Sequence, residues 1–229
     1  MRGVALITGA ASGIGAATAR LFGERGWRVA GLDLGASDTE LSVVADVSDL
    51  EAVRAAAGRA AAELGPVSAL VTAAGYYESA PIDELDPDRW RRMLSVHLGG
   101  TVNACRAVVP GMLAAGSGAI VTISSELALS GSPGDAHYTA AKGAIIGFTR
   151  SLGWELAARG VRVNSVAPGP TDTPLLPPGS RDRSPEYLRT LPLGRLVRAD
   201  EVAETVALLV EEGDYFAGQT LSPNAGAVI

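Results

Sequence analysis

Short apolar runs that alternate with helical patterns limit most strongly what this chain can fold into. The apolar runs predict buried strands over Val4–Thr8, Trp27–Asp33, Leu41–Ala45, Val67–Ala73, Ala119–Ser124, Val161–Ala167 and Gln219–Ser222. Helical patterns fill most of the intervals, over Ile14–Arg25, Asp49–Leu64, Pro87–Ala115, Ala136–Arg159 and Ala199–Val210. This alternation is typical of an α/β protein, and we predict a doubly wound parallel sheet of about seven strands with helices on both faces.

Length and composition place this sheet in a single domain. The chain has 229 residues, 47% of them apolar, which suffices for one sizeable core but not for two ordinary domains. We therefore expect one domain over residues 1–229. The net charge of −6 comes without a basic stripe, which argues against a nucleic-acid partner. A single cysteine, Cys105, excludes an internal disulfide and a cysteine-based zinc cluster.

The same sequence gives expectations about location and metals. The chain passes directly into its first expected strand, and no apolar run reaches the ~18 residues that a membrane span needs. We expect a soluble cytoplasmic protein without a membrane partner. The two histidines have no obvious carboxylate partner at ligand spacing, so no metal site is expected.

Two connections depart from the regular alternation. Only Leu34–Glu40 separates the second and third expected strands, and a parallel crossover normally needs a dozen or more residues. The helix expected there is therefore missing or reduced to a turn. Proline and glycine concentrate in Pro168–Pro192, which predicts a long irregular segment. Such a segment inside a compact domain is often a lid or binding loop, and we expect a substrate loop over residues 170–198.

A glycine-rich stretch, Thr8–Gly15, follows the first strand and opens a helix, which is the context a dinucleotide-binding motif needs. Gly9 permits a tight turn, and Gly13 and Gly15 let backbone and helix approach a pyrophosphate. Asp33 ends the next strand 18 residues after Gly15, where a carboxylate can bond a ribose 2′-hydroxyl and would repel a 2′-phosphate. We predict a Rossmann-like NAD site, with NADP disfavoured.

A tyrosine and a lysine point to the chemistry. Tyr138 and Lys142 stand four residues apart and share a helix face, with Ser125 thirteen residues before the tyrosine. A phenol has a pKa of about 10, and a nearby ammonium lowers it toward the range in which a general base works at neutral pH. These residues predict a hydride-transfer enzyme.

These motifs, taken in order, resemble the short-chain dehydrogenase/reductase family over essentially the whole chain. The matching segments are Thr8–Gly15, Asp46-Val47, Ala73–Gly75, Ser125, Tyr138, Lys142, Asn164–Gly169 and Thr173. The resemblance implies that Tyr138 exchanges a proton with the substrate oxygen and that Ser125 orients that oxygen. It also implies that Lys142 lowers the tyrosine pKa and holds the nicotinamide ribose. Ser124 is a rival to Ser125, but the spacing to Tyr138 favours the latter.

The resemblance also assigns the cofactor contacts. Asp46 and Val47 are expected at the adenine, Ala74 and Gly75 on the adenosine side, and Pro168, Gly169, Thr171 and Thr173 at the nicotinamide end. Without the family match, Asp46 would equally be a helix N-cap. The full expected cofactor set is Gly9, Ser12, Gly13, Ile14, Gly15, Asp33, Asp46, Val47, Ala74, Gly75, Tyr138, Lys142, Pro168, Gly169, Thr171 and Thr173.

The sequence departs from the family pattern at two places. Thr72–Gly75 stands where the family commonly has Asn-Asn-Ala-Gly, and we expect little effect on the chemistry. His97 stands where the family usually has an asparagine that helps to hold a water linked to the lysine. An imidazole can also donate and accept, so we hypothesise a catalytic relay role for His97 that adds a pH dependence, against a buried structural histidine. His137 is expected at the surface or at a subunit contact.

The substrate is left open between several classes. A secondary alcohol or ketone is expected, and an NAD preference favours oxidation. Anionic substrates are suggested by Arg181, Arg183, Arg189 and Arg195, and by Arg89, Arg91 and Arg92, against the alternative of solvated surface charge. The Gly169–Thr173 run and the short link after Asp33 resemble dehydrogenases of cyclic dihydrodiols. Ketoacyl reductases of the same family and a catalytically weak NAD-binding regulator are the alternatives.

The resemblance also implies an assembly. Members of the family are usually homotetramers or homodimers, paired through helices that here are Pro87–Ala115 and Ala136–Arg159. Gly143, Ala144 and Gly147 would allow close approach of two helices in such a contact.

Overall fold

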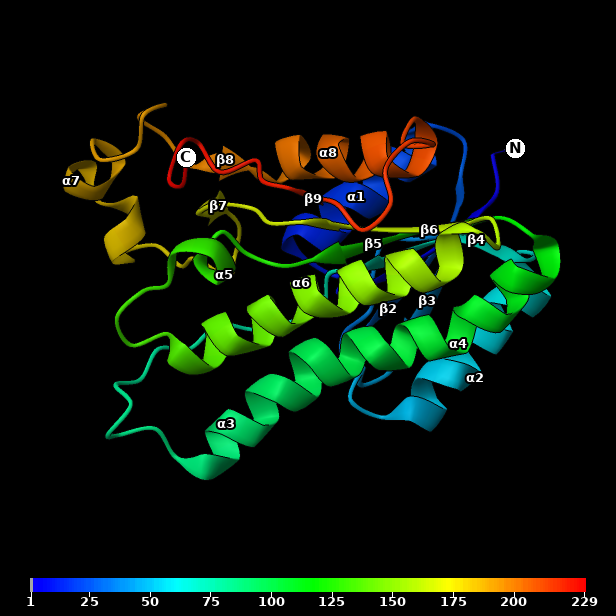
Figure 1. Cartoon of the computed structure of the whole chain (residues 1–229), viewed down its shortest axis with the longest axis horizontal. Helices are drawn as coiled ribbons and strands as arrows, with labels where there is room; N and C mark the ends of the chain where they lie inside the picture. Colours follow the sequence, from blue (N-terminus) through cyan, green and yellow to red (C-terminus); the bar gives the residue numbers. More distant parts are fainter. Residues whose placement is uncertain (1) are drawn as a thin grey trace.

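The computed structural model describes residues 2–229 and contains a seven-stranded parallel sheet (Figure 1). The strand order is β3-β2-β1-β4-β5-β6-β9. The strands are β1 Val4–Thr8, β2 Arg28–Asp33, β3 Leu41–Val44, β4 Val67–Thr72, β5 Gly118–Ile123, β6 Val161–Val166 and β9 Thr220–Leu221. The predicted strands and the predicted fold class are confirmed, with every strand end within one residue of its expected place.

Helices cover both faces of the sheet. Helices α1 Gly13–Glu24 and α8 Ala199–Glu211 pack together on one face, and α2 Leu50–Glu63, α4 Gly100–Ala115 and α6 Ala136–Ala157 lie on the other (Figure 1). Successive strand residues enter different cores because side chains alternate across a strand. In β1, Leu6 joins the core beneath α2 and α4, and Ile7 joins the core beneath α1 and α8.

The strand order creates the place where the site forms. The chain runs outward from β1 to β3 and then returns to place β4 on the other side of β1. Loops that leave the carboxyl ends of β1 and β4 diverge at this reversal and leave a crevice, the usual ligand position in open α/β sheets. The glycine-rich loop after β1 lies there.

The predicted long helix over Pro87–Ala115 is not one α-helix. It consists of α3 Pro87–Leu94, a π-helical turn over Ser95–Gly99, and α4. A π-turn inserts an extra residue into the helical repeat, and such turns are frequent at functional sites. The turn contains His97 and directs its side chain into the protein, where it is buried.

The two unusual connections have different outcomes. Residues 34–40 form bends and no helix, so the short parallel link between β2 and β3 is confirmed. The segment Pro168–Pro192 is less irregular than predicted. It contains β7 Thr171–Asp172, a 3-10 turn over Arg181–Arg183 and α7 Pro185–Leu188, and β7 pairs with β8 Val197–Arg198.

These short elements gather at one end of the molecule. Together with α5 Leu127–Ser130 they lie beyond the carboxyl ends of β5 and β6 (Figure 1, left). Within residues 2–229, no helix combines the length and apolarity that crossing a membrane requires.

Candidate active site

The glycine-rich loop is shaped by close backbone contacts. Gly9 and Gly13 have φ angles of +73° and +54°, which side chains other than glycine rarely adopt. A Cβ on Gly9 would lie 2.7 Å from the backbone of Ala73, and one on Gly15 would lie 2.0 Å from the carbonyl oxygen of Gly9. The loop therefore needs glycine at both places, and α1 begins directly beneath the turn.

Asp33 faces this loop from the end of β2. The Ala11 N–H donates to Asp33 Oδ2 at 3.0 Å, and the Gly35 N–H donates to Oδ1 at 3.3 Å. These bonds hold the carboxylate beside the glycine turn, where a cofactor ribose would lie. A carboxylate here can accept from a ribose hydroxyl, and the small loop residues leave the backbone open to a pyrophosphate.

The residues expected at the adenine are held by local hydrogen bonds. Asp46 Oδ1 accepts from both the N–H and the hydroxyl of Ser48, each at 2.8 Å. The N-cap of α2 is Asp49, whose side chain accepts hydrogen bonds from the backbone N–H groups of Glu51 and Ala52. The alternative reading of Asp46 as an N-cap is therefore wrong. The Val47 carbonyl accepts from Asn103 Nδ2 at 2.9 Å, and the Ala74 N–H donates to Thr8 Oγ1 at 3.2 Å.

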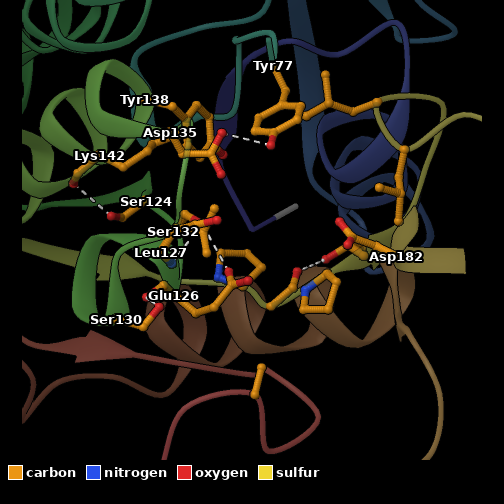
Figure 2. A pocket seen from close by; sticks show the side chains of 18 of the residues that line it. Tyr77, Ser124, Glu126, Leu127, Ser130, Ser132, Asp135, Tyr138, Lys142 and Asp182 are labelled. Carbon is orange, nitrogen blue, oxygen red and sulfur yellow. Dashed lines mark hydrogen bonds between the residues drawn. The ribbon is translucent and has the colours of Figure 1, made fainter. Parts of the chain in front are cut away.

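A cavity of ≈ 630 Å³ opens next to this loop (Figure 2). It brings together the serine, tyrosine and lysine that the sequence singled out, along with His97. The predicted cofactor residues on its wall are Ile14, Gly75, Tyr138, Lys142, Pro168, Gly169, Thr171 and Thr173. Those outside its wall are Gly9, Ser12, Gly13, Gly15, Asp33, Asp46, Val47 and Ala74.

Tyr138 and Lys142 reach this cavity from one face of α6, as their spacing predicts. Lys142 Nζ lies 5.7 Å from the centre of the Tyr138 ring and donates to the Ile123 carbonyl at 2.8 Å. Both side chains are buried. The Ser124 hydroxyl donates to the Lys142 carbonyl at 2.8 Å and so ties β5 to α6. Ser125 remains the serine whose hydroxyl turns toward the other polar groups of the site.

The pKa of Tyr138 is raised in this structure, not lowered. Burial is the main cause, and the charge of Glu126 adds to it, while contact with Ser125 acts in the opposite direction. Burial also lowers the pKa of Lys142 to about 8. Lys142 points its ammonium at the Ile123 carbonyl and over the tyrosine ring, which explains why the expected lowering by the lysine does not appear in this arrangement.

His97 sits against the tyrosine. Its ring meets the Tyr138 ring edge-on with 5.6 Å between centres, and its Nε2 lies 2.8 Å from the Tyr76 carbonyl oxygen. Burial, followed by the charge of Lys142, lowers the pKa of His97 to about 3. The expectation that His97 titrates near neutral pH is therefore wrong, because the ring is neutral there. Among residues 2–229, the buried Nδ1 has no hydrogen-bond partner.

The predicted position of His137 is also wrong. It is fully buried, whereas a surface or subunit-contact position was expected. Its Nε2 lies 3.8 Å from Glu78 Oε1, which is too far for a hydrogen bond. The segment before α3 covers this side of α6, since the Ala80 N–H donates to the Gly134 carbonyl at 2.8 Å.

The arginines contribute less to the cavity than their number suggested. Of those within residues 2–229, Arg181 alone lines it. Arg183 pairs with Asp172 at 2.6 Å, and Arg195 pairs with Glu201 at 2.7 Å. The arginine cluster on α3 is likewise engaged elsewhere: Arg89 pairs with Glu78, Arg91 pairs with Asp88, and Arg92 lies over the Tyr76 ring.

The sequence reading missed an acidic and aromatic group on the cavity wall, made of Tyr77, Glu126, Asp135 and Asp182. The Tyr77 hydroxyl donates to Asp135 Oδ1 at 2.9 Å, and its ring meets Tyr138 edge-on. Glu126 Oε2 accepts from the Ser125 hydroxyl at 2.9 Å. The available signal was the position of Glu126 directly after the expected serine.

Comparison with known proteins places the chain. The family model described as Enoyl-(Acyl carrier protein) reductase matches residues 9–227. The cis-4-hydroxycyclohexanecarboxylate dehydrogenase of Sinomonas cyclohexanicum is 43% identical over 97% of this chain and 95% of its own length. A 3-oxoacyl-(acyl-carrier-protein) reductase of Chlamydia trachomatis is 35% identical over 97% and 96%.

A solved structure agrees with these relatives. The ligand-free aldohexose dehydrogenase of Thermoplasma acidophilum has a TM-score of 0.92 and 30% identity, covering 97% of this chain and 92% of its own. The fold and these relatives define an oxidoreductase that acts on CH–OH groups. The chain belongs to the short-chain dehydrogenase/reductase family.

Proposed function

We propose that the protein is an NAD-dependent oxidoreductase that interconverts a secondary alcohol and a ketone. The observation that carries the proposal is one cavity wall that holds Ser125, Tyr138 and Lys142 beside the glycine-rich loop. These are the hydroxyl, phenol and ammonium groups that such a reaction uses, and a nicotinamide cofactor supplies the hydride acceptor or donor when it is bound.

The residues of the crevice fit a dinucleotide. The narrow turn at Gly9 and Gly15 leaves backbone amides free near the start of α1, and Asp33 offers a carboxylate to a ribose. Asp46, Val47, Ala74 and Gly75 would hold the adenosine half. Ser12, Gly13, Ile14, Pro168, Gly169, Thr171 and Thr173 would hold the remainder, with Lys142 at the nicotinamide ribose.

Tyr138 would carry the proton step. In oxidation its phenoxide takes the hydroxyl proton of the substrate, and in reduction its hydroxyl returns that proton to the carbonyl oxygen. Ser125 would hold the same oxygen in place. Because burial raises the pKa of Tyr138 in this structure, its phenoxide needs a nearby positive charge, and Lys142 is the closest candidate on the same helix face.

His97 would supply a hydrogen-bond acceptor on the path of that proton. Its buried Nδ1 can accept a hydrogen bond if Nε2 carries the proton that faces the Tyr76 carbonyl. With a pKa of about 3, the ring would act as a neutral acceptor and not as an imidazolium. We propose a relay role for His97 on this basis, without the pH dependence that the sequence suggested.

NAD is proposed over NADP. Asp33 would repel a 2′-phosphate, and its own hydrogen bonds come from neutral backbone amides, not from an arginine or lysine that could receive that phosphate. The ketoacyl reductase alternative has support from the Chlamydia relative. The position of Asp33 is the feature that favours an NAD-linked alcohol oxidation.

We also propose a homotetramer or homodimer through α4 and α6. A shallow groove lined mostly by apolar side chains runs between them, including Cys105, Val109 and Phe148. The measured mass in solution tests this proposal, and a monomer at micromolar concentration would contradict it. The cytoplasmic location, the single-domain division and the substrate loop over residues 170–198 stay predictions.

Replacing Tyr138 with phenylalanine tests the function directly. The variant keeps the ring and its packing but loses the proton-carrying hydroxyl. We expect turnover of secondary alcohols with NAD to fall by about 10³-fold or more, while NADH affinity stays within about threefold. Undiminished turnover in the variant would refute the role of Tyr138, and failure of the unmodified protein to oxidise any secondary alcohol would refute the function.

A further inference from the structure

A buried carboxyl group that the proposed reaction does not use lies next to the reacting position. Glu126 follows Ser125 at the end of β5, and only 7% of it is exposed. Its backbone N–H donates to the Pro168 carbonyl at 3.0 Å, which fixes the turn. Figure 2 shows its side chain at the cavity wall.

The partners of this carboxyl are few. Its Oε2 accepts from the Ser125 hydroxyl, and backbone amides of Glu126 and Leu127 lie near it. In the part of the chain that the structure describes, no lysine or arginine is among these partners. Burying a carboxylate without a cation is costly, so a group of this kind on a cavity wall needs a compensating role.

Its neighbours decide what kind of ligand it would accept. Asp182 adds a second negative charge nearby, and Tyr138 and Tyr187 are the other titratable groups that interact with it. Asp135 is already bonded to Tyr77. A substrate anion placed against Glu126 would meet repulsion, whereas an uncharged hydroxyl would find an acceptor.

That acceptor lies one hydrogen-bond length from the Ser125 hydroxyl, which would hold the reacting oxygen. Ser125 Oγ accepts from the Leu127 N–H at 3.2 Å and commits its own proton to Glu126 Oε2 at 2.9 Å. A reacting oxygen held by Ser125 therefore lies within reach of the carboxyl. The two oxygens of a gauche vicinal diol are about one hydrogen-bond length apart, so the second hydroxyl of a diol can meet the same carboxyl.

We propose that Glu126 is a specificity-determining residue that accepts a hydrogen bond from a second hydroxyl on the carbon next to the reacting one, so that the substrate class is uncharged vicinal diols. The inference rests on the proposed function and names its substrate. The second hydroxyl takes the place of the Ser125 hydroxyl as the donor to Glu126 Oε2, so Ser125 can donate its proton to the reacting oxygen. A simple alcohol has no second hydroxyl and cannot release Ser125 in this way.

The reaction balances without a further partner. The reacting carbon loses a hydride to NAD, its hydroxyl loses a proton to Tyr138, and a carbonyl forms in place of the C–O single bond. The product is an α-hydroxy ketone with NADH and one proton. Glu126 stays unchanged throughout and only orients the spectator hydroxyl.

Matched substrates test the proposal. With the full-length protein and NAD, kcat/KM is measured for cis-cyclohexane-1,2-diol, cyclohexanol and cis-4-hydroxycyclohexanecarboxylate at a pH well above 7. The unmodified protein is expected to prefer the diol to cyclohexanol by roughly 10- to 100-fold, the range of a hydrogen bond to a charged group. Glu126→Ala is expected to remove most of that preference, and Glu126→Gln, which keeps a carbonyl acceptor, to restore part of it.

The ratio of kcat/KM for the diol to kcat/KM for cyclohexanol distinguishes recognition of the second hydroxyl from a structural effect on the site. A variant that merely disturbed Ser125 would lower both rates and leave the ratio of diol to cyclohexanol unchanged, which would overturn the proposal. Equal kcat/KM for the diol and cyclohexanol in the unmodified protein, or a preference for the hydroxy acid, would overturn it while the dehydrogenase function stood. No turnover of any of these alcohols, or of a wider secondary-alcohol panel, with either NAD or NADP would refute the function and the inference together.

Discussion

The two ends of the crevice are built in different ways. At the end proposed for the cofactor (the cofactor end), the shape comes from backbone: glycines with positive φ angles, amides that hold Asp33, and a helix that starts beneath the turn. At the end proposed for the substrate (the substrate end), the shape comes from side chains brought from distant parts of the chain, among them Tyr77, Glu126 and Asp182. A backbone site tolerates few substitutions, whereas a side-chain site can change its ligand one residue at a time.

This difference explains what each end can specify. In the proposed site, the backbone amides would recognise the pyrophosphate that every dinucleotide shares, and Asp33 would recognise only whether the ribose carries a free 2′-hydroxyl. The charged and aromatic side chains at the other end can distinguish one alcohol from another, because an unpaired polar group in a site strongly rejects a ligand that cannot satisfy it. The predictions below test whether the two ends respond separately.

The largest effect is expected from adding one methyl group to the cofactor end. In Gly15→Ala the new Cβ would lie 2.0 Å from the Gly9 carbonyl oxygen, so the loop must shift. We expect NADH affinity to fall by about 100-fold or more, measured by calorimetry, because overpacking moves the backbone that forms the site.

Gly23→Ala is the matched control in the same helix. No atom lies within 4 Å of the position its Cβ would take. This variant should bind NADH normally and gain up to about 1 kcal/mol of stability, since alanine is the better helix former. Equal NADH affinity in the two variants would contradict the close-packed description of the loop.

The next effect concerns the charge at the substrate end. Burial raises the pKa of Glu126 from 4.5 to about 7, so the folded protein holds a proton that the unfolded chain has lost between these values. The free energy of unfolding should therefore fall as pH rises from about 4.5 to 7, and the loss should be complete above 7. We expect Glu126→Gln to remove a pH-dependent loss of about 3 kcal/mol.

Denaturant unfolding of both proteins at pH 5 and pH 8 measures this difference. The stability of Glu126→Gln relative to the unmodified protein should be greater at pH 8 than at pH 5. NADH affinity should be nearly the same in the two proteins. An equal stability difference at both pH values would show that Glu126 does not titrate as described.

The smallest effect is expected at His97, whose ring packs against Tyr138. His97→Ala should lower turnover by about tenfold if the neutral ring takes part in the relay, and NADH affinity should change little. His97→Asn, which retains a donor and an acceptor, should recover most of the loss. Because the pKa of His97 is about 3, the pH profile between 5 and 8 should keep its shape in both variants. Unchanged turnover in His97→Ala would show that the relay role is wrong.

The sequence predicted the sheet closely for a physical reason. Strands of a parallel sheet are buried on both faces, so most of them are mainly apolar runs, and β1 matches its prediction residue for residue. The π-turn at Ser95–Gly99 could not be predicted in this way. Its residues continue an ordinary helical pattern, and the extra residue is visible only in the hydrogen bonds of the folded chain.

The sequence also could not predict which groups surround each side chain in the folded protein. The spacing of Tyr138 and Lys142 predicted their shared face, but it could not predict that a loop covers His137 or that Lys142 bonds a strand carbonyl. The same limit applied to Arg183, whose sequence position gave no sign of its partner Asp172. Partners brought from distant segments by the fold decide whether a charged residue is free to bind a ligand.

One measurement tests the central claim most directly: separate calorimetric titrations of the purified protein with NADH and with NADPH. The account predicts clear NADH binding and NADPH binding at least about tenfold weaker, because Asp33 accepts from a ribose hydroxyl and repels a phosphate. Equal affinity for the two cofactors would contradict the role of Asp33. Binding of neither would contradict the cofactor site itself and, with it, the proposed NAD-linked dehydrogenase.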